Sequence, residues 1–226
     1  MRSITRVLRR LGPEDRFFSV DEYGPFPIKR HGGRRRVRRG EYPTIPQYQS
    51  SKGWLIVTVA LELSTNQVTH FYSEKKDTGE MIALLGRLLN QYTGCRRVYF
   101  SWDAASWHSS KRFLAEVLRV NKFEYRKSNQ TPMVKLAPLP ARAQFLNVIE
   151  SVFSGMSQSI IQNSDYESVA AAKDAIDRYF RERNTYFKKN PKRAGGKLWG
   201  NELVPSKFSE SNNCKNPKWM NLAAVR

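Results

Sequence analysis

The sequence has few cysteines, few acidic residues and no long apolar run. Its two cysteines, Cys95 and Cys214, are too few for a disulfide framework, and neither stands at a zinc-ligand spacing. No stretch approaches the roughly 18 consecutive apolar residues that cross a bilayer, and the first residues lack the apolar core of a signal peptide. We therefore expect a cytoplasmic protein with reduced thiols and no membrane partner.

The charge is strongly one-sided. Lys and Arg number 39 against 20 Asp and Glu, which gives a formal net charge of +19. A cationic surface binds polyanions because each phosphate contact releases condensed counterions. Nucleic acid is the expected partner, and an anionic membrane surface is the lesser alternative because no basic amphipathic helix has a clean apolar face. The 40% hydrophobic content is that of a globular protein.

The order of apolar patterns predicts a mixed α/β sheet flanked by helices, with three antiparallel strands followed by parallel ones. We divide the chain into a basic lead-in (1–15), one catalytic domain (16–187) and a basic tail (188–226). The first strand is expected to end near Asp21. The remaining expected elements are strands at 53–63, 67–72, 96–102 and 123–126, helices at 77–92, 109–120, 145–158 and 166–187, and an irregular connection at 131–143.

A glycine-spaced arginine cluster follows the first strand. Such a cluster is either a solvated charge run or a loop that contacts phosphates, and the cationic background favours DNA contact. The residues expected to bind DNA are Arg34, Arg35, Arg36, Arg38 and Arg39.

Three carboxylates fall where a sheet of this kind places a site. Asp21 lies late in the first predicted strand and Asp103 just past the fourth, so both are expected at the carboxyl edge. Glu150 lies on a predicted helix among apolar neighbours, although it could simply face solvent near the positive end of the helix dipole. Together the three acids would suit Mg²⁺ or Mn²⁺, and two ions about 3.5 to 4 Å apart could catalyse in-line phosphoryl transfer.

Three blocks of the sequence resemble mariner-type DDE transposases, specifically their bacterial insertion-sequence branch. The block FSVDEYG (18–24) resembles the family's first-acid strand, and DAASWH (103–108) resembles its Asp-Asn-Ala-x-x-His block. The block LPARAQFLNVIE (139–150) resembles Leu-Pro-x-Tyr-Ser-Pro-x-Leu-Asn-Pro-Ile-Glu. The chain departs from these patterns at Ala104 and Val148, and its second and third acids are further apart than in mariner relatives.

The resemblance implies a ribonuclease H-like fold and a metal-dependent site. Its metal ligands would be Asp21, Asp103 and Glu150, with Asn147 and His108 as supporting residues; for both, a cap or core contact is the simpler alternative. Relatives usually begin with helix-turn-helix modules, whereas only about 15 residues precede the first strand here. A separately encoded DNA-binding subunit, a homodimer and a nucleoid-associated bacterial location are further expectations.

Three functions are compatible with these features. The leading hypothesis is a transposase catalytic domain that cleaves DNA at element ends and joins the 3′-hydroxyl to target DNA. The alternative is an inactive remnant that only binds DNA. A basic RNA-binding protein would explain the charge but not the three acids in motif register.

Overall fold

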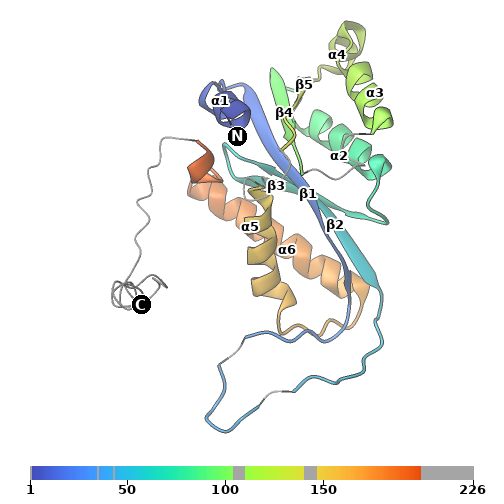
Figure 1. Ribbon diagram of the computed structural model, residues 1–226, viewed down its shortest axis with the longest axis vertical. Helices are drawn as coiled ribbons and strands as arrows, with labels where there is room; N and C mark the ends of the chain where they lie inside the picture. The colour runs from blue at the N-terminus through green and yellow to red at the C-terminus, as the bar shows by residue number, and fades with distance from the viewer. Residues whose placement is uncertain (1, 35, 43, 104–109, 140–146, 200–226) are drawn as a thin grey trace, which may run out of the picture.

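In a computed structural model of the chain, the residues described are 2–34, 36–42, 44–103, 110–139 and 147–199. Their strands form a five-stranded sheet in the order β3-β2-β1-β4-β5 (Figure 1). The pairs β1·β2 and β2·β3 are antiparallel, whereas β1·β4 and β4·β5 are parallel. The predicted mixed sheet, with its antiparallel strands first, is therefore confirmed.

The central strand β1 (Asp15–Pro27) is longer than predicted. We expected it to end near Asp21, but its pairing with β2 (Trp54–Glu62) resumes at Phe26 after a register shift that begins at Tyr23. An irregularity of this kind lets a strand pass a proline, which has no amide hydrogen to donate to the ladder. Asp21 consequently lies inside a continuous strand. The predicted hairpin is confirmed by β2 and β3 (Gln67–Ser73).

The far edge of the sheet corrects the prediction for residues 123–126. There the alternation of Phe123 and Tyr125 with charged residues imitates a strand, but the segment belongs to helix α4 (Phe123–Asn129), and Phe123 is exposed. Four residues are too few to distinguish the two periods. The actual strand is β5 (Met133–Leu136), within the segment predicted to be irregular, where it pairs with β4 (Arg97–Ser101).

Helices cover the two faces of the sheet with separate apolar clusters. Helices α2 (Thr78–Gln91) and α3 (Lys111–Val120) pack on one face, and Asp77 caps α2 by accepting a hydrogen bond from the Glu80 amide at 3.1 Å. On the other face lie α5 (Ile149–Met156), the π-helical turn η3 (Ser157–Ile161) and α6 (Val169–Lys189). Helices were predicted in all four places, although residues 145 and 146 of the 145–158 segment lie outside those described.

The two ends of the described chain also join the core. The lead-in forms helix α1 (Arg2–Arg9), whose Ile4 and Leu8 are buried in the cluster beneath α5 and α6. A 3₁₀ turn, η4 (Gly196–Leu198), contacts α1, and Trp199 is buried beside it. No helix among the described residues is both long and apolar enough to span a membrane.

Between β1 and β2 the chain leaves the sheet as a long arm, residues 28–53, at the end opposite α1 (Figure 1). Its root is closed by two backbone bonds, from Ile28 N to Gly53 O and from Lys52 N to Ile28 O, both 2.8 Å long. The arm carries the arginine cluster, of which Arg34, Arg36, Arg38 and Arg39 are exposed. Arg35 lies outside the described residues.

Candidate active site

The strands β1 and β4 run parallel toward the edge of the sheet that carries Asp21 and Asp103. Ser19 pairs with Ser101, the last residue of β4, and each of the two acids lies two residues further along the chain. Neighbouring strands lie about 4.8 Å apart, and side chains two residues apart share a face. Asp21 therefore follows Ser19 onto the face that α5 covers, and Asp103, just past the end of β4, lies near enough to Asp21 to affect its charge.

Asn147 ties Asp21 to the start of α5. Its Nδ2 donates to Asp21 Oδ2 at 2.8 Å, and its Oδ1 accepts from the Ser19 hydroxyl at 2.8 Å. The Ser19 Oγ in turn accepts from the Ile149 amide at 3.4 Å, within the first turn of the helix. Since Asn147 and Ser19 are buried, this chain of bonds holds β1 and α5 together through donors and acceptors that are all paired.

Glu150 lies one residue beyond Ile149, in the first turn of α5, and is exposed. A carboxylate here is favoured by the positive end of the helix dipole. Its neighbours Ile149, Val152 and Phe153 are buried and fix the helix against the sheet. The structure thus brings Glu150 to the same edge as Asp21, on a helix whose position the Asn147 contacts define.

The electrostatics of Asp21 reflect this gathering of acids. Burial is the main cause that raises the Asp21 pKa to about 6, and repulsion from Asp103, Glu22 and Glu150 adds to it. The hydrogen bond from the Glu22 amide acts in the opposite direction, because it stabilises the ionised carboxylate. That amide donates to Oδ1 at 2.8 Å. Within the described chain no Lys or Arg forms an ion pair with Asp21. Its negative charge is therefore costly, and a cation placed beside it would remove that cost.

The donor set suits a hard divalent cation, because carboxylate oxygens are the ligands that Mg²⁺ and Mn²⁺ prefer. Among the described residues, however, no three acidic, histidine or cysteine side chains approach closely enough to form a complete metal-ligand group. Asp21, Asp103 and Glu150 therefore share an edge without forming a closed cage. His108, the other predicted supporting residue, lies outside the described residues.

Sequence reasoning missed Ser19. A serine in a strand carries no functional signal by itself, and its role appears only when the register and the Asn147 contact are known. The one available signal was its position two residues before Asp21, which puts both side chains on one face of β1.

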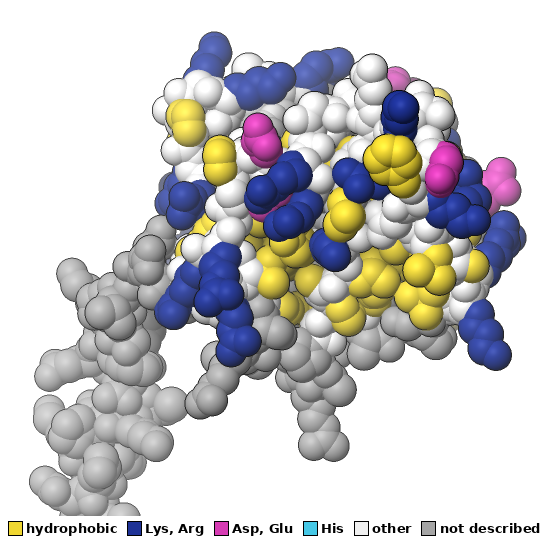
Figure 2. Space-filling model, turned by 90° about the horizontal axis from the view of Figure 1, so that it is seen from above, with side chains coloured by type: hydrophobic (Ala, Val, Ile, Leu, Met, Phe, Trp, Pro, Cys, Tyr) yellow, Lys and Arg dark blue, Asp and Glu magenta, His cyan; other side chains and the backbone are white. Residues whose placement is uncertain are grey.

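The surface around the fold is cationic. In a view from above, Lys and Arg side chains are spread across the molecule and Asp and Glu are sparse (Figure 2). Such a surface attracts polyanions at long range, which agrees with the expectation of a nucleic-acid partner.

Comparison with solved structures places the fold. A Mos1 transposase paired-end complex with the left transposon end superposes with a TM-score of 0.62 at 17% identity, covering 88% of this chain and 56% of that one. The Mos1 mariner paired-end complex with Mn gives a TM-score of 0.59 at 16% identity, covering 88% and 59%. The catalytic domain of Mos1 mariner transposase gives 0.55 at 15% identity, covering 83% of both chains. The predicted ribonuclease H-like transposase fold is confirmed.

The sequence itself gives the family. No curated protein sequence matches the chain. The family described as DDE superfamily endonuclease matches residues 16–173, a span that includes Asp21, Asp103 and Glu150 and covers most of the chain. The chain belongs to the DDE superfamily endonuclease family.

Proposed function

We propose that this chain is the catalytic domain of a transposase, from the bacterial insertion-sequence branch of the mariner-type family. It would cleave DNA at element ends and transfer the resulting 3′-hydroxyl to target DNA. The observation that supports this most directly is the gathering of Asp103 and Glu150 around Asp21, whose pKa they raise, within a family match to DDE endonucleases. We further propose residues 16–187 as the catalytic unit, with 1–15 and 188–226 as appendages.

The proposed metal ligands are Asp21, Asp103 and Glu150, and two ions are expected. When bound, Mg²⁺ or Mn²⁺ would activate a water or a 3′-hydroxyl and stabilise the leaving oxygen. Asn147 contributes by occupying one lone pair of Asp21 Oδ2, while the Glu22 amide occupies one of Oδ1. The carboxylate is thereby held in one orientation with its remaining lone pairs available. His108 is retained as a second supporting residue.

The proposed partner is DNA, both the element ends and the target, contacted in part by Arg34, Arg35, Arg36, Arg38 and Arg39. The first solved structure compared with this chain is named as a transposase complex with a transposon end, and the chain spans 56% of its length. We also propose a separately encoded helix-turn-helix subunit as a partner that recognises the element ends. A homodimer that pairs two ends and a location at the bacterial nucleoid complete the proposal.

The test is metal-dependent nicking of duplex DNA by the purified chain. Wild type should nick in Mn²⁺ or Mg²⁺ and not in EDTA, and Asp103→Asn should abolish nicking without loss of fold. The matched control is Asp174→Asn, which makes the same charge change at an exposed position of α6. Full nicking by Asp103→Asn would refute the assignment.

The alternative proposal is a DNA-binding remnant without catalysis. It would be favoured by a folded wild type that binds DNA with strong salt dependence and nicks under none of these conditions, even when an end-binding subunit is supplied.

A further inference from the structure

The arm does not swing from the sheet as a free loop, because its root is docked on the connection between η3 and α6. The His31 amide donates to Ser164 O at 2.9 Å, and Asn163 Nδ2 donates to Arg34 O at 3.1 Å. On the returning limb, Lys52 Nζ donates to Tyr166 O at 2.8 Å and forms an ion pair with Asp165 at 3.5 Å. The residues at the base of the arm are therefore preorganised for binding a ligand.

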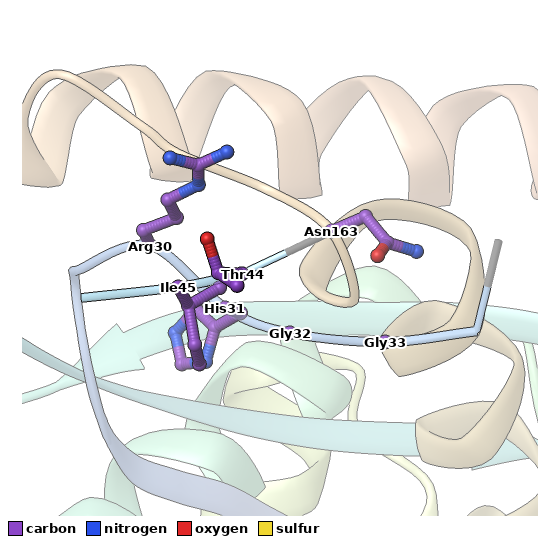
Figure 3. A pocket seen from close by; sticks show the side chains of 7 residues that line it. All are labelled: Arg30, His31, Gly32, Gly33, Thr44, Ile45 and Asn163. Carbon is purple, nitrogen blue, oxygen red and sulfur yellow. The ribbon is translucent and has the colours of Figure 1, made fainter. Parts of the chain in front are cut away.

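Two adjoining hollows lie against Gly32 and Gly33. One is completed by Arg30, His31, Thr44, Ile45 and Asn163, so both limbs of the arm and the η3–α6 connection contribute to it (Figure 3). The other, which we name the arm-root pocket, is lined by Gly32, Gly33, Arg34, Gln158 and Gln162. Gln158 lies in η3 and Gln162 is the extended residue that follows it, and both line this pocket together with the arm.

The lining of the arm-root pocket is rich in hydrogen-bond donors and contains no acid. Within the described residues the amides of Gly32 and Gly33 donate to no acceptor, and Arg34 forms no ion pair. Two acids of the arm and of the η3–α6 connection have partners of their own, since Asp165 pairs with Lys52 and Glu41 accepts from the Arg38 amide. Glycine amides, a guanidinium and carboxamides together are the groups that bind a phosphate oxygen.

We propose that the arm-root pocket binds a phosphodiester group of a DNA backbone, as a second DNA contact separate from the active site. The pocket is open rather than enclosed, which suits one phosphate of a continuous strand. Asp21 and Pro27 are six residues apart on an extended strand, about 20 Å, and the pocket lies beyond Pro27. A duplex rises about 3.4 Å per base pair, so about six base pairs span that part of the path and a longer duplex continues toward the pocket.

The proposal depends on the proposed function only in taking the phosphate from DNA, and the experiment is arranged to keep the two apart. Binding of a short generic duplex is measured by fluorescence anisotropy in EDTA, where no metal-dependent cleavage occurs. Gln162→Glu places a negative charge in the pocket, and the Gln162 side chain makes no hydrogen bond that the change would break among the described residues. Gln47→Glu makes the same charge change on an exposed part of the same arm.

Gln162→Glu should bind DNA about tenfold more weakly than Gln47→Glu, the loss expected for one charge-assisted hydrogen-bonded contact. The slope of log K against log salt should fall by about 0.9, one phosphate, for Gln162→Glu alone.

Equal affinities for the two glutamate variants would overturn the proposal. The source of the phosphate is tested by adding inorganic phosphate and following the Gly32 and Gly33 amides by NMR. If inorganic phosphate shifts these amide resonances but Gln162→Glu leaves the DNA affinity unchanged, the pocket binds free anions and not DNA, which would also overturn the proposal. The effect of Gln162→Glu on DNA affinity does not require nicking. The binding result can therefore be interpreted even if the catalytic assignment fails.

Discussion

Asn147 donates a 2.8 Å hydrogen bond from its amide nitrogen to Asp21, across 126 residues of sequence. The same side chain accepts from Ser19, two residues before Asp21 on the same strand face. One amide therefore spans two consecutive same-face positions of β1 and fixes where the helix bearing Glu150 begins. The proposed metal ligands from β1 and α5 are thus positioned relative to each other by Asn147, which bonds Asp21 directly and precedes Glu150 by three residues.

Replacing Asn147 by Ala should damage activity more than stability. The change removes the donor to Asp21 Oδ2 and the acceptor of the buried Ser19 hydroxyl proton, which costs about 1–3 kcal/mol in unfolding free energy. Nicking or metal affinity should fall about 10- to 100-fold, the usual effect of losing a group that orients a ligand.

The matched control for this change is Asn121→Ala. Asn121 also makes two hydrogen bonds, to the backbone of Val134 at 2.9 and 2.8 Å, far from the acids. It should lose similar stability and keep its nicking rate when assayed below the melting temperature. If both variants lose nicking equally, Asn147 contributes to stability and has no specific role in positioning Asp21.

Ser19 and Asn147 should behave as one unit. Ser19→Ala removes the donor that fixes the Asn147 amide orientation, so the amide can rotate and present its oxygen to Asp21 instead. In a double-mutant cycle, the Ser19→Ala/Asn147→Ala variant should be about as impaired as Asn147→Ala alone, with a coupling energy of about 0.5–3 kcal/mol. Additive losses in nicking would show that the two residues act independently.

Glu150→Gln should abolish nicking without a cost in stability. The side chain is exposed, so surface substitution there should change the unfolding free energy by no more than about 0.5 kcal/mol. Nicking should fall at least about 100-fold if Glu150 is a metal ligand. Glu124→Gln is the control, since Glu124 is also an exposed glutamate in the first turn of a helix, α4.

The order of the sheet was largely predictable, because long strands and amphipathic helices carry strong periodic signals. Failures came where the pattern was short or depended on distant contacts. Phe123 and Tyr125 alternate like a strand over only four residues, whereas Val134 becomes a strand residue because β4 and Asn121 pair with its backbone. The sequence of residues 133–136 alone contains no pattern that predicts this pairing.

The motif blocks were enough to propose the three acids and Asn147 as site residues, but not the contacts that join them. Asp21, Asp103 and Glu150 could be proposed from motif spacing, and the parallel register explains why the first two lie together. Ser19 could not, since its function is created by an asparagine 128 residues away. The arm-root pocket is a similar case, because Gly32 and Gln162 meet only when the arm docks on the turn after η3.

Leu8→Ala should destabilise the whole protein, because α1 is packed on the core and not a detached lead-in. Leu8 is 2% exposed and lies in the cluster with Phe17 and Trp199. The loss should be about 2–5 kcal/mol in unfolding free energy, measured by urea denaturation. Arg9→Ala, on the exposed side of α1, should change stability by less than about 0.5 kcal/mol. Wild-type stability for Leu8→Ala would mean that α1 is dispensable.

Binding of Mn²⁺ should stabilise the protein at pH 7.5 far more than at pH 5, because of the Asp21 pKa of about 6. The folded pKa is raised above the unfolded 3.8, so in the ion-free protein Asp21 lowers stability as pH rises from about 4 to 6 and the cost persists above 6. A cation offsets that cost where Asp21 is ionised. At pH 5 the ion must first displace a proton, which weakens its apparent affinity about tenfold.

Thermal unfolding with and without saturating Mn²⁺ measures this difference. An ion at about 100 times its Kd adds about 2.7 kcal/mol, which is a rise of about 5–10 °C in Tm for a protein of this size. Asp21→Asn should show little rise at either pH, because its side chain neither titrates nor supplies an anionic ligand. Equal rises for wild type at pH 5 and pH 7.5 would place the bound ion elsewhere, since only a site that includes Asp21 is coupled to its protonation.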